Sequence, residues 1–314
     1  MREQVLWNER KEVEWLNYTV QPPKGFLTGD YYKAEKEFGA PEGMEGHHGT
    51  LEVVCQDGKI VFVEFNEKTM PGYYNQYFGG IDKRRSDYGI WQASKARQAK
   101  AGVVLADGMA YIEAQIMEQQ SLTGEFKFLT GASGSMKNML PMATQLAEEV
   151  KTPSHRKIYS LSEDFGYGIT GWLKVIIEDD NKIVDFSYDE IFADHQEPIN
   201  YPELKRYYKQ SKYHSPCYQD PFAPGWDRHC WNCSFRAIMD QLKERVLDCQ
   251  DLFNIDGLIY TDGVNMGAIW DSKEQYTEPY TNNTAVRYPA YDNYLRMVGK
   301  LAEHLPSQFR VRRG

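Results

Sequence analysis

A run of small and hydroxyl-bearing residues in the first half of the chain has the chemistry of an anion site. Residues 126–129 are predicted as a short apolar strand, and a helical pattern of apolar residues begins near residue 136. Between them lie Thr130, Gly131, Ala132, Ser133, Gly134 and Ser135. A helix start offers unpaired amides and the positive end of the dipole, and small residues let a ligand approach the backbone. The pattern predicts a phosphate site; a plain helix cap without a ligand is the alternative.

A second candidate feature is the loop at residues 70–91, which is rich in aromatic and basic side chains. Flat aromatic faces match a flat heterocycle, and a nearby basic residue stabilises a negative charge on such a ring. Three consecutive basic residues occupy positions 83–85. A loop that simply packs on a sheet is the alternative. The aromatic residues that we expect to wall a ring are Tyr73, Tyr77, Tyr88 and Trp91.

A third candidate is the CxxC motif of Cys230 and Cys233. Such a pair serves as a redox dithiol or as half of a zinc site. A second pair of ligands at ordinary spacing is not seen in the sequence, and two thiols without a special role remain the alternative. The chain has five cysteines at uneven spacing, which suits a reducing compartment better than a disulfide framework.

The elements that position these residues occur twice along the chain. The amphipathic stretch 136–150 resembles 291–305, with Asn138 matching Asn293. Alternating apolar residues around a turn predict β-hairpins at 49–67 and 171–190, each preceded by a strand, at 32–39 and 159–166. Each half then shows a long helical stretch and an apolar strand: 87–120 with 126–129, and 234–252 with 258–260.

This order predicts an α+β protein of two tandem repeats, each an antiparallel sheet with a long helix and a C-terminal helix. Residues 1–30 form an N-terminal extension, in which 20–25 looks like an extended linker. The first repeat covers residues 31–152 and the second covers 153–314.

The strand, the turn Thr130-Gly131-Ala132-Ser133 and the following helix resemble the FMN-binding domain family. That family includes flavin-carrying subunits of the Rnf and Na⁺-pumping NADH:quinone oxidoreductase complexes, and flavin-bearing electron-transfer lipoproteins. Its motif is similar to Asp-x-x-Ser/Thr-Gly-Ala-Ser/Thr, and the resemblance implies that Ser133 is the place of covalent FMN attachment. The family's acidic residue falls on Lys127, so we expect non-covalent FMN, with the lysine favouring the phosphate by its charge.

The second repeat departs further from this motif. Its matching turn is Thr261-Asp262-Gly263, where Val264 replaces the serine and residues 264–288 are inserted. The carboxylate of Asp262 would repel a phosphate. We therefore expect one FMN per chain, held by the first repeat.

Composition narrows the function classes. The net charge of −9 and the pI of about 5.4 argue against a nucleic-acid binder. The sequence contains no stretch of about 18 apolar residues, so it predicts no membrane-spanning helix. The charged N-terminus favours a cytoplasmic protein, or an extracytoplasmic one if a leader has been removed. The expected function is electron transfer or flavin-dependent reduction, with a redox partner or a small-molecule electron acceptor. The alternatives are a non-catalytic duplicated binding or scaffold module, and a thiol redox or metal protein centred on Cys230 and Cys233.

Overall fold

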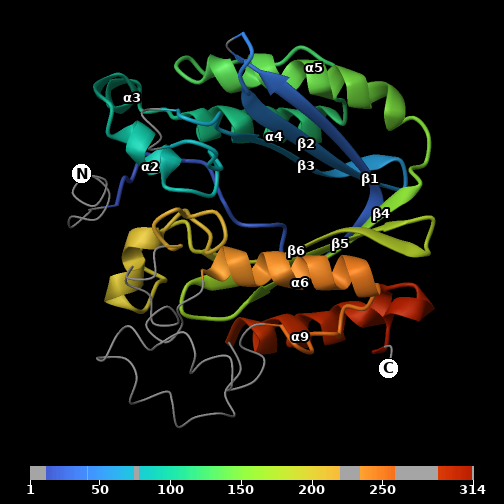
Figure 1. The fold of residues 1–314 in the computed structure, drawn as a ribbon. Helices are drawn as coiled ribbons and strands as arrows, with labels where there is room; N and C mark the ends of the chain where they lie inside the picture. The colour runs from blue at the N-terminus through green and yellow to red at the C-terminus, as the bar shows by residue number, and fades with distance from the viewer. Residues whose placement is uncertain (1–11, 41, 74–77, 220–233, 259–288, 313–314) are drawn as a thin grey trace.

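Six antiparallel strands form one sheet in the computed structural model, which describes residues 12–40, 42–73, 78–219, 234–258 and 289–312 (Figure 1). The strand order is β3-β2-β1-β4-β5-β6, and helices accompany the sheet, so the predicted α+β class is confirmed. The strands are β1 (Gly25–Phe38), β2 (His47–Gln56), β3 (Lys59–Lys68), β4 (Arg156–Asp164), β5 (Ile169–Glu178) and β6 (Lys182–Phe192).

The two predicted hairpins are present as β2–β3 and β5–β6. Their turns contain consecutive residues with positive φ: 51° and 73° at Asp57 and Gly58, and 49° and 56° at Asp179 and Asp180. Two adjacent left-handed residues are the backbone signature of the tight turns that match strand twist. Aspartate and glycine adopt this conformation more readily than most residues, so local chemistry fixes both turns.

Strand β1 joins the two parts of the sheet because its ends pair with different neighbours. Residues 25–30 pair with β4, and residues 30–38 pair with β2. The change of partner occurs beside Gly29, where an added Cβ atom would clash with the carbonyl oxygen of Cys55. Only glycine leaves room for the backbone of β2 at this point.

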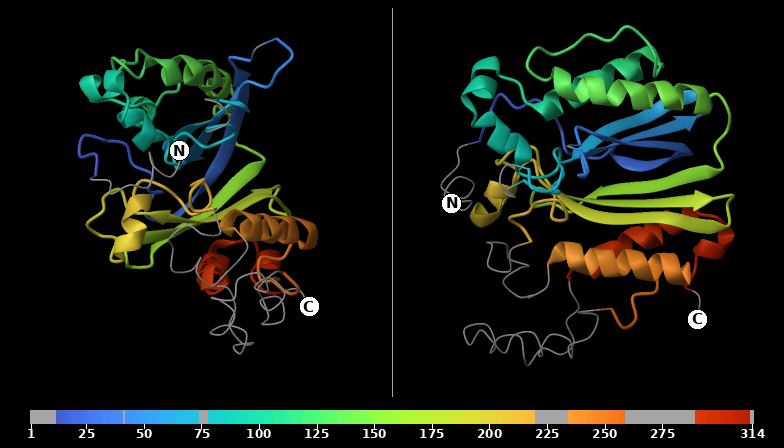
Figure 2. Two further views of the ribbon diagram at one scale, coloured as in Figure 1. Left: turned by 60° about the vertical axis from the view of Figure 1, so that its left-hand side comes forward. Right: turned by 45° about the horizontal axis from the view of Figure 1, so that its top comes forward.

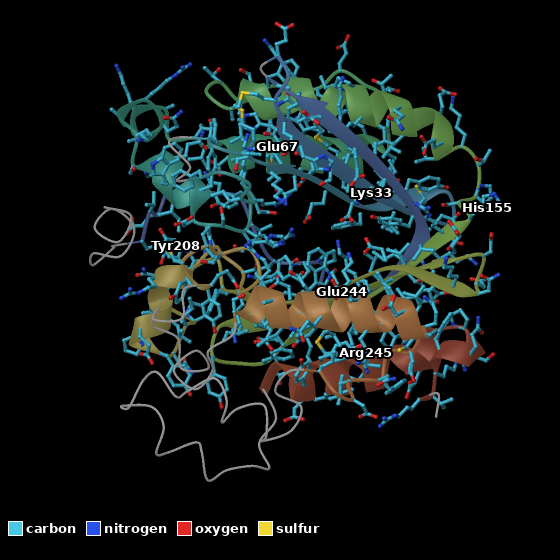
Figure 3. The ribbon with its side chains drawn as sticks, in the orientation of Figure 1. Lys33, Glu67, His155, Tyr208, Glu244 and Arg245 are labelled. Carbon is cyan, nitrogen blue, oxygen red and sulfur yellow. The ribbon has the colours of Figure 1, made fainter. Side chains whose placement is uncertain are left out.

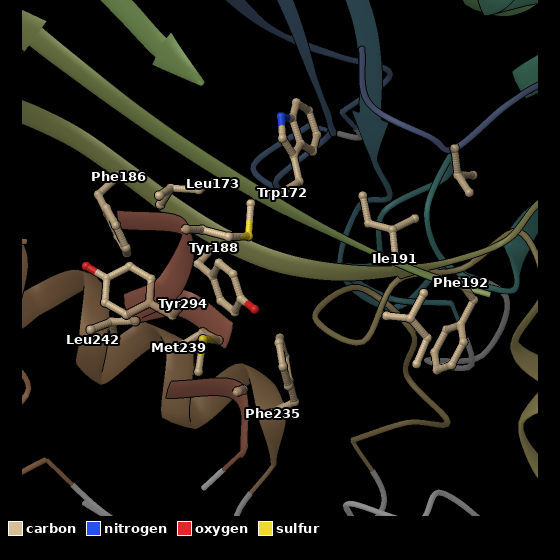
Figure 4. Packing of buried hydrophobic residues seen from close by; sticks show 14 of the residues in the cluster. Trp172, Leu173, Phe186, Tyr188, Ile191, Phe192, Phe235, Met239, Leu242 and Tyr294 are labelled. Atoms are coloured by element: carbon tan, nitrogen blue, oxygen red, sulfur yellow. The ribbon is translucent and has the colours of Figure 1, made fainter. Parts of the chain in front are cut away.

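Helices cover the two parts of the sheet on separate sides (Figures 1 and 2). Helices α4 (Leu105–Gln119) and α5 (Ser133–Glu149) pack on β1–β3, and α6 (Phe235–Cys249) and α9 (Pro289–Leu301) pack on β4–β6. We call β1–β3 with α4 and α5 the first half, and β4–β6 with α6 and α9 the second half. The buried apolar residues form two hydrophobic cores, and Figure 4 shows part of the larger one. There Met239 and Tyr294 lie among apolar side chains, and Trp172 lies on the other side of the ribbon.

The outer strands of the sheet are each capped by a glutamine at the end of a helix. Gln120 follows α4 and Gln250 follows α6, both in the left-handed conformation. The Gln120 side chain accepts a hydrogen bond from the amide of Ile60 (2.9 Å) and donates to its carbonyl (3.0 Å). Gln250 makes the same two contacts with Ile183, at 2.7 and 3.0 Å. Each helix end is thereby fixed to the edge of the sheet that it covers.

Residues 12–24, which we call the N-terminal strap, run without helix or strand between the two halves. Leu16, Tyr18 and Val20 are buried, with 3%, 1% and 0% of their surfaces exposed. The sequence predicts a linker over part of this segment, whereas its apolar side chains belong to the larger core.

Some predicted elements differ in the structure. The stretch 87–120 is three helices, α2 (Tyr88–Ala93), α3 (Ala96–Ala101) and α4, because the chain turns at Ser94 and again at Gly102. Residues 126–129 form no strand. In the second half the predicted helices correspond to α6 and α9, while most of the predicted strand 258–260 lies outside the described residues. Across the described ranges, no helix combines the length and apolar character needed to cross a membrane.

Candidate functional site

The start of α5 is open to solvent and carries no side-chain cap. Its N-cap is Ala132, which makes no side-chain hydrogen bond, and Ser133 is the first helical residue. Ser133 and Gly134 are exposed, as are Thr130 and Lys127 before them. The first amides of a helix have no partner within the helix. These amides, two hydroxyls and one ammonium group therefore face solvent at the positive end of a helix of 17 residues.

The local sequence explains why the helix begins here. Gly131 has φ of 103°, which a residue with a side chain rarely adopts, and this turn brings Ala132 into the core. Met136, Met139 and Ala143 follow at helical spacing and are fully buried against the first half of the sheet. The apolar side of α5 fixes the helix, and its polar start is left outside.

Two of the four predicted ring-wall residues are already packed against other aromatic side chains. Tyr88 and Trp91 are 4% and 7% exposed, with ring centroids 5.3 Å apart, and both contact the buried Phe78. Tyr73 is half-buried, and its ring lies nearly perpendicular to that of His47, with the ring centroids 4.9 Å apart. Tyr77 lies outside the described residues. Of the three predicted ring-wall residues that the structure describes, Tyr73 keeps a partly accessible side chain, while Tyr88 and Trp91 belong to the core.

The three consecutive basic residues of this loop are buried, and each forms an ion pair with a carboxylate. Lys83 Nζ lies 2.6 Å from Glu67 Oε2. Arg84 binds both oxygens of Glu113, at 2.6 and 3.0 Å. The third residue, Arg85, binds both oxygens of Glu64.

The pair of Arg85 and Glu64 has the clearest electrostatic consequence. Burial alone would raise the pKa of Glu64, but the charge and hydrogen bonds of Arg85 outweigh burial and lower it to about 2. The guanidinium carbon also lies 4.7 Å from the ring centroid of Trp172 on β5. Arg85 thus joins a strand of the first half to a strand of the second.

A polar cavity of about 330 Å³ lies between the two halves. Its walls come from strands of both halves and from α6, and side chains fill the surrounding space, with Lys33 labelled among them (Figure 3). Lys174 on β5 reaches across it to Glu52 on β2, at 2.9 Å. His214 Nδ1 lies 3.6 Å from Asp82 Oδ2 at another part of the wall. Most charges that line the cavity are thus paired with each other.

Each half contains the same contact of an asparagine, a glutamate and a lysine. In the first half Asn138 of α5 donates to Glu67 Oε1 at 3.1 Å, and Lys83 contacts Oε2 of the same carboxylate. In the second half Asn293 of α9 donates to Glu190 Oε1 at 3.0 Å, and Lys212 Nζ lies 2.7 Å from Glu190 Oε2. The backbone repeats as well, since the amides of both lysines donate to the carbonyls of those glutamates at 2.8 Å.

Sequence reasoning missed the carboxylate partners of the basic residues. A signal was present, because Glu52 and Glu64 interrupt the apolar pattern of strands that are otherwise buried. A buried acidic position in a strand calls for a cationic partner elsewhere in the chain. The described residues contain no group of three or more His, Cys, Asp or Glu side chains that could hold a metal ion.

Some of the predicted positions lie outside the described residues. They are Tyr77, the side chain of Ser135, both CxxC cysteines and the turn 261–263.

Comparison with known proteins adds little. No family model matches the chain, and no curated protein matches it. A protein from Clostridium perfringens of known crystal structure is similar at 26% sequence identity, over 41% of this chain and 95% of that one, with a TM-score of 0.28. This score carries no argument about fold or function.

Proposed function

We propose that this chain is an FMN-binding flavoprotein that acts in electron transfer or as a small flavin-dependent reductase. The observation that supports it is the open start of α5, where Ser133 and Gly134 are exposed and the N-cap residue offers no side chain of its own. A phosphate at this point would receive backbone amides and hydroxyl donors together. The resemblance of this turn to the FMN-binding domain family also supports the proposal.

The residues present fit the phosphate end of FMN better than its ring. The hydroxyls of Thr130 and Ser133 and the amides of Ser133 and Gly134 would hold the phosphate, with Lys127 adding positive charge. Of the predicted ring contacts, the half-buried Tyr73 is suited to lie beside a flavin. The flavin itself supplies the electron chemistry when bound, and the chain supplies binding and orientation.

We favour non-covalent attachment, because Lys127 occupies the position of the acidic residue in the family motif. The alternative is covalent attachment through the exposed Ser133 hydroxyl, and acid denaturation distinguishes it from non-covalent binding. The electron partner is a redox protein or a small-molecule acceptor.

We further propose that the two halves are tandem repeats that arose by duplication. Support comes from the symmetric strand order and from the shared contact of asparagine, glutamate and lysine in both halves. The two glutamine caps, Gln120 and Gln250, give independent support, since both bind the edge strand in the same way. Under this proposal the second half keeps the fold and has lost the phosphate turn.

A non-catalytic binding or scaffold module is the second candidate. It is favoured by the charged contacts that join the halves, among them Lys174 with Glu52 and Arg85 with Trp172. Such contacts would make a rigid duplicated platform without any cofactor.

The experiment that separates the two candidates is titration of the purified protein with FMN, followed by flavin fluorescence and visible absorbance. Saturable binding of one FMN per chain supports the flavoprotein, and no uptake of FMN supports the scaffold module. Acid precipitation of the loaded protein then tests attachment: flavin in the supernatant means non-covalent binding, and flavin in the pellet means a covalent bond.

A further inference from the structure

The polar cavity between the two halves has more acidic than basic side chains in its wall. Seven carboxylates and five lysine or arginine side chains line it. Four of these carboxylates form ion pairs with lysine or arginine, namely Glu52, Glu64, Glu67 and Asp185. The remaining three form no ion pair with a lysine or arginine of the described ranges, and they are Asp82, Asp189 and Asp240. Buried carboxylates are normally paired with cations, so the cavity carries negative charge that its own wall does not neutralise.

Two consecutive residues, Tyr213 and His214, gather these three carboxylates. The amide of Tyr213 donates to Asp189 Oδ1 at 3.1 Å, and its hydroxyl donates to Asp240 at 2.5 Å. His214 Nδ1 lies 3.6 Å from Asp82 Oδ2. We call these five residues the acidic end of the cavity. Because Asp82 follows β3 and Asp189 lies on β6, both parts of the sheet contribute to it.

Asp189 is the most enclosed of the three carboxylates. It is 8% exposed, and its Oδ1 accepts two hydrogen bonds from neutral backbone amides, those of Glu190 and Tyr213. Burial raises the pKa of Asp189, although the charges of His214 and Arg85 act in the opposite direction. A cation that enters the cavity would therefore stabilise the ionised form of this side chain.

The corresponding position of the first half carries its own cation. Lys83 and Lys212 make the same contact, so Arg85 and His214, each two residues further on, correspond to each other. The guanidinium of Arg85 binds both oxygens of Glu64. The second half places an imidazole at that position, and no arginine neutralises its carboxylates.

The size of the cavity indicates what kind of cation it can hold. About 330 Å³ suits a small organic molecule. A metal ion is a poorer match, because the described residues contain no group of three or more His, Cys, Asp or Glu side chains that could hold one. We infer that the cavity is a binding site for a small organic amine, whose ammonium group is held at the acidic end by Asp82, Asp189 and Asp240. This site is separate from the open start of α5, and the inference does not depend on FMN binding.

The test is isothermal titration calorimetry with compounds of four carbon atoms that differ in charge, at one ionic strength. We expect putrescine, which carries two ammonium groups, to bind saturably, and neutral butane-1,4-diol and anionic succinate not to bind. Magnesium chloride tests for non-specific attraction of cations, and we expect no saturable binding of Mg²⁺. No saturable binding of putrescine, equal binding of the diol, preference for succinate, or Mg²⁺ bound as tightly as putrescine would each overturn the inference.

Variants locate the site within the cavity. His214→Arg gives the second half the cation that Arg85 gives the first, and we expect it to weaken putrescine binding about tenfold or more, which corresponds to about 1.4 kcal/mol. Asp240→Asn removes one charge from a half-buried position and should weaken binding about three- to tenfold.

The matched control for the loss of charge is Asp180→Asn, at an exposed side chain in the turn between β5 and β6, which should bind putrescine like the wild type. If His214→Arg does not fold, Asp240→Asn decides by comparison with this control: a weaker affinity supports the inference. A folded His214→Arg or Asp240→Asn protein with the affinity of the control overturns it.

Discussion

The two halves of the molecule share one set of contacts and differ in the residues that come next along the chain. Glu67 and Glu190 each bind a lysine and an asparagine. After Lys83 the chain continues with Arg84 and Arg85, whereas after Lys212 it continues with Tyr213 and His214.

These differing residues have different partners. The two arginines are buried against Glu113 and Glu64. In the second half the Tyr213 hydroxyl donates to Asp240 at 2.5 Å, and His214 lies beside Asp82. The shared contact therefore belongs to the fold, and the arginine pairs are particular to the half that carries the open helix start.

The start of α5 also differs from the start of α6, a helix of the second half that corresponds to α4 rather than to α5. Ser234 caps α6 by accepting the amide of Ala237 at 3.1 Å, so that helix satisfies one of its own free amides. Helix α5 begins after Ala132, which has no such group to offer. A helix start without a side-chain cap leaves its amides for water or for a ligand, so changes there should affect binding more than folding.

The largest expected loss of stability comes from breaking one of the buried arginine–glutamate pairs of the first half. Arg85→Met would leave the carboxylate of Glu64 buried without its partner, and we expect the free energy of unfolding to fall by about 3–5 kcal/mol. The measurement is urea unfolding at neutral pH. The matched control is Lys151→Met, which removes an exposed pair with Glu148 and should cost less than about 1 kcal/mol. A loss of stability in Arg85→Met no larger than in the control would show that the buried pair does not stabilise the fold.

The pair of Arg85 and Glu64 also makes the stability of the protein depend on pH. The pKa of Glu64 lies near 2 in the folded protein, below its ordinary value of 4.5, so its contribution to stability is present above 4.5 and is lost as the pH falls toward 2. Urea midpoints measured from neutral pH down to about pH 3 should fall less steeply for Glu64→Gln than for the wild type. Equal slopes would mean that other carboxylates dominate acid unfolding.

A smaller loss of stability is expected when the hydrogen bond from asparagine to glutamate is removed in either half. Asn138→Ala and Asn293→Ala each remove a donor to a buried carboxylate, and we expect each to destabilise the protein by about 1–3 kcal/mol. The effect should be smaller for Asn293, because the hydroxyl of Tyr188 still donates to Glu190 Oε1 at 2.8 Å. Parallel urea unfolding of the two variants measures this difference, and the opposite order would contradict the compensation by Tyr188.

The smallest effect on stability belongs to the open helix start. Ser133→Ala combined with Thr130→Val changes exposed residues, so unfolding should shift by no more than about 0.5 kcal/mol. FMN binding, followed by fluorescence titration, should nevertheless weaken by about 1–3 kcal/mol through lost donors. Thr144→Ala, an exposed hydroxyl further along α5, is the control. An FMN affinity equal to that of the control would show that these hydroxyls do not contribute to FMN binding.

The sequence predicts the local features of the fold well and the long-range ones poorly. Both hairpins are expected from alternation and from turn residues such as Asp57 and Gly58, which act over a few positions. The pairing of Arg84 with Glu113 cannot be read in this way, because it joins residues 29 positions apart on a loop and a helix. Tyr88 and Trp91 show the same limit, since aromatic residues that suit a ring site also suit a core, and only packing decides between the two.

The glutamine caps have a consequence for how the protein behaves when many copies are present. An edge strand with free amides and carbonyls is a template on which another chain can add a strand and begin to aggregate. Gln120 and Gln250 occupy both backbone groups of Ile60 and Ile183, and Glu113 accepts the amide of Phe65 further along β3. The side chains that fix the helices to the sheet therefore also occupy backbone groups with which an added strand would pair at both outer edges.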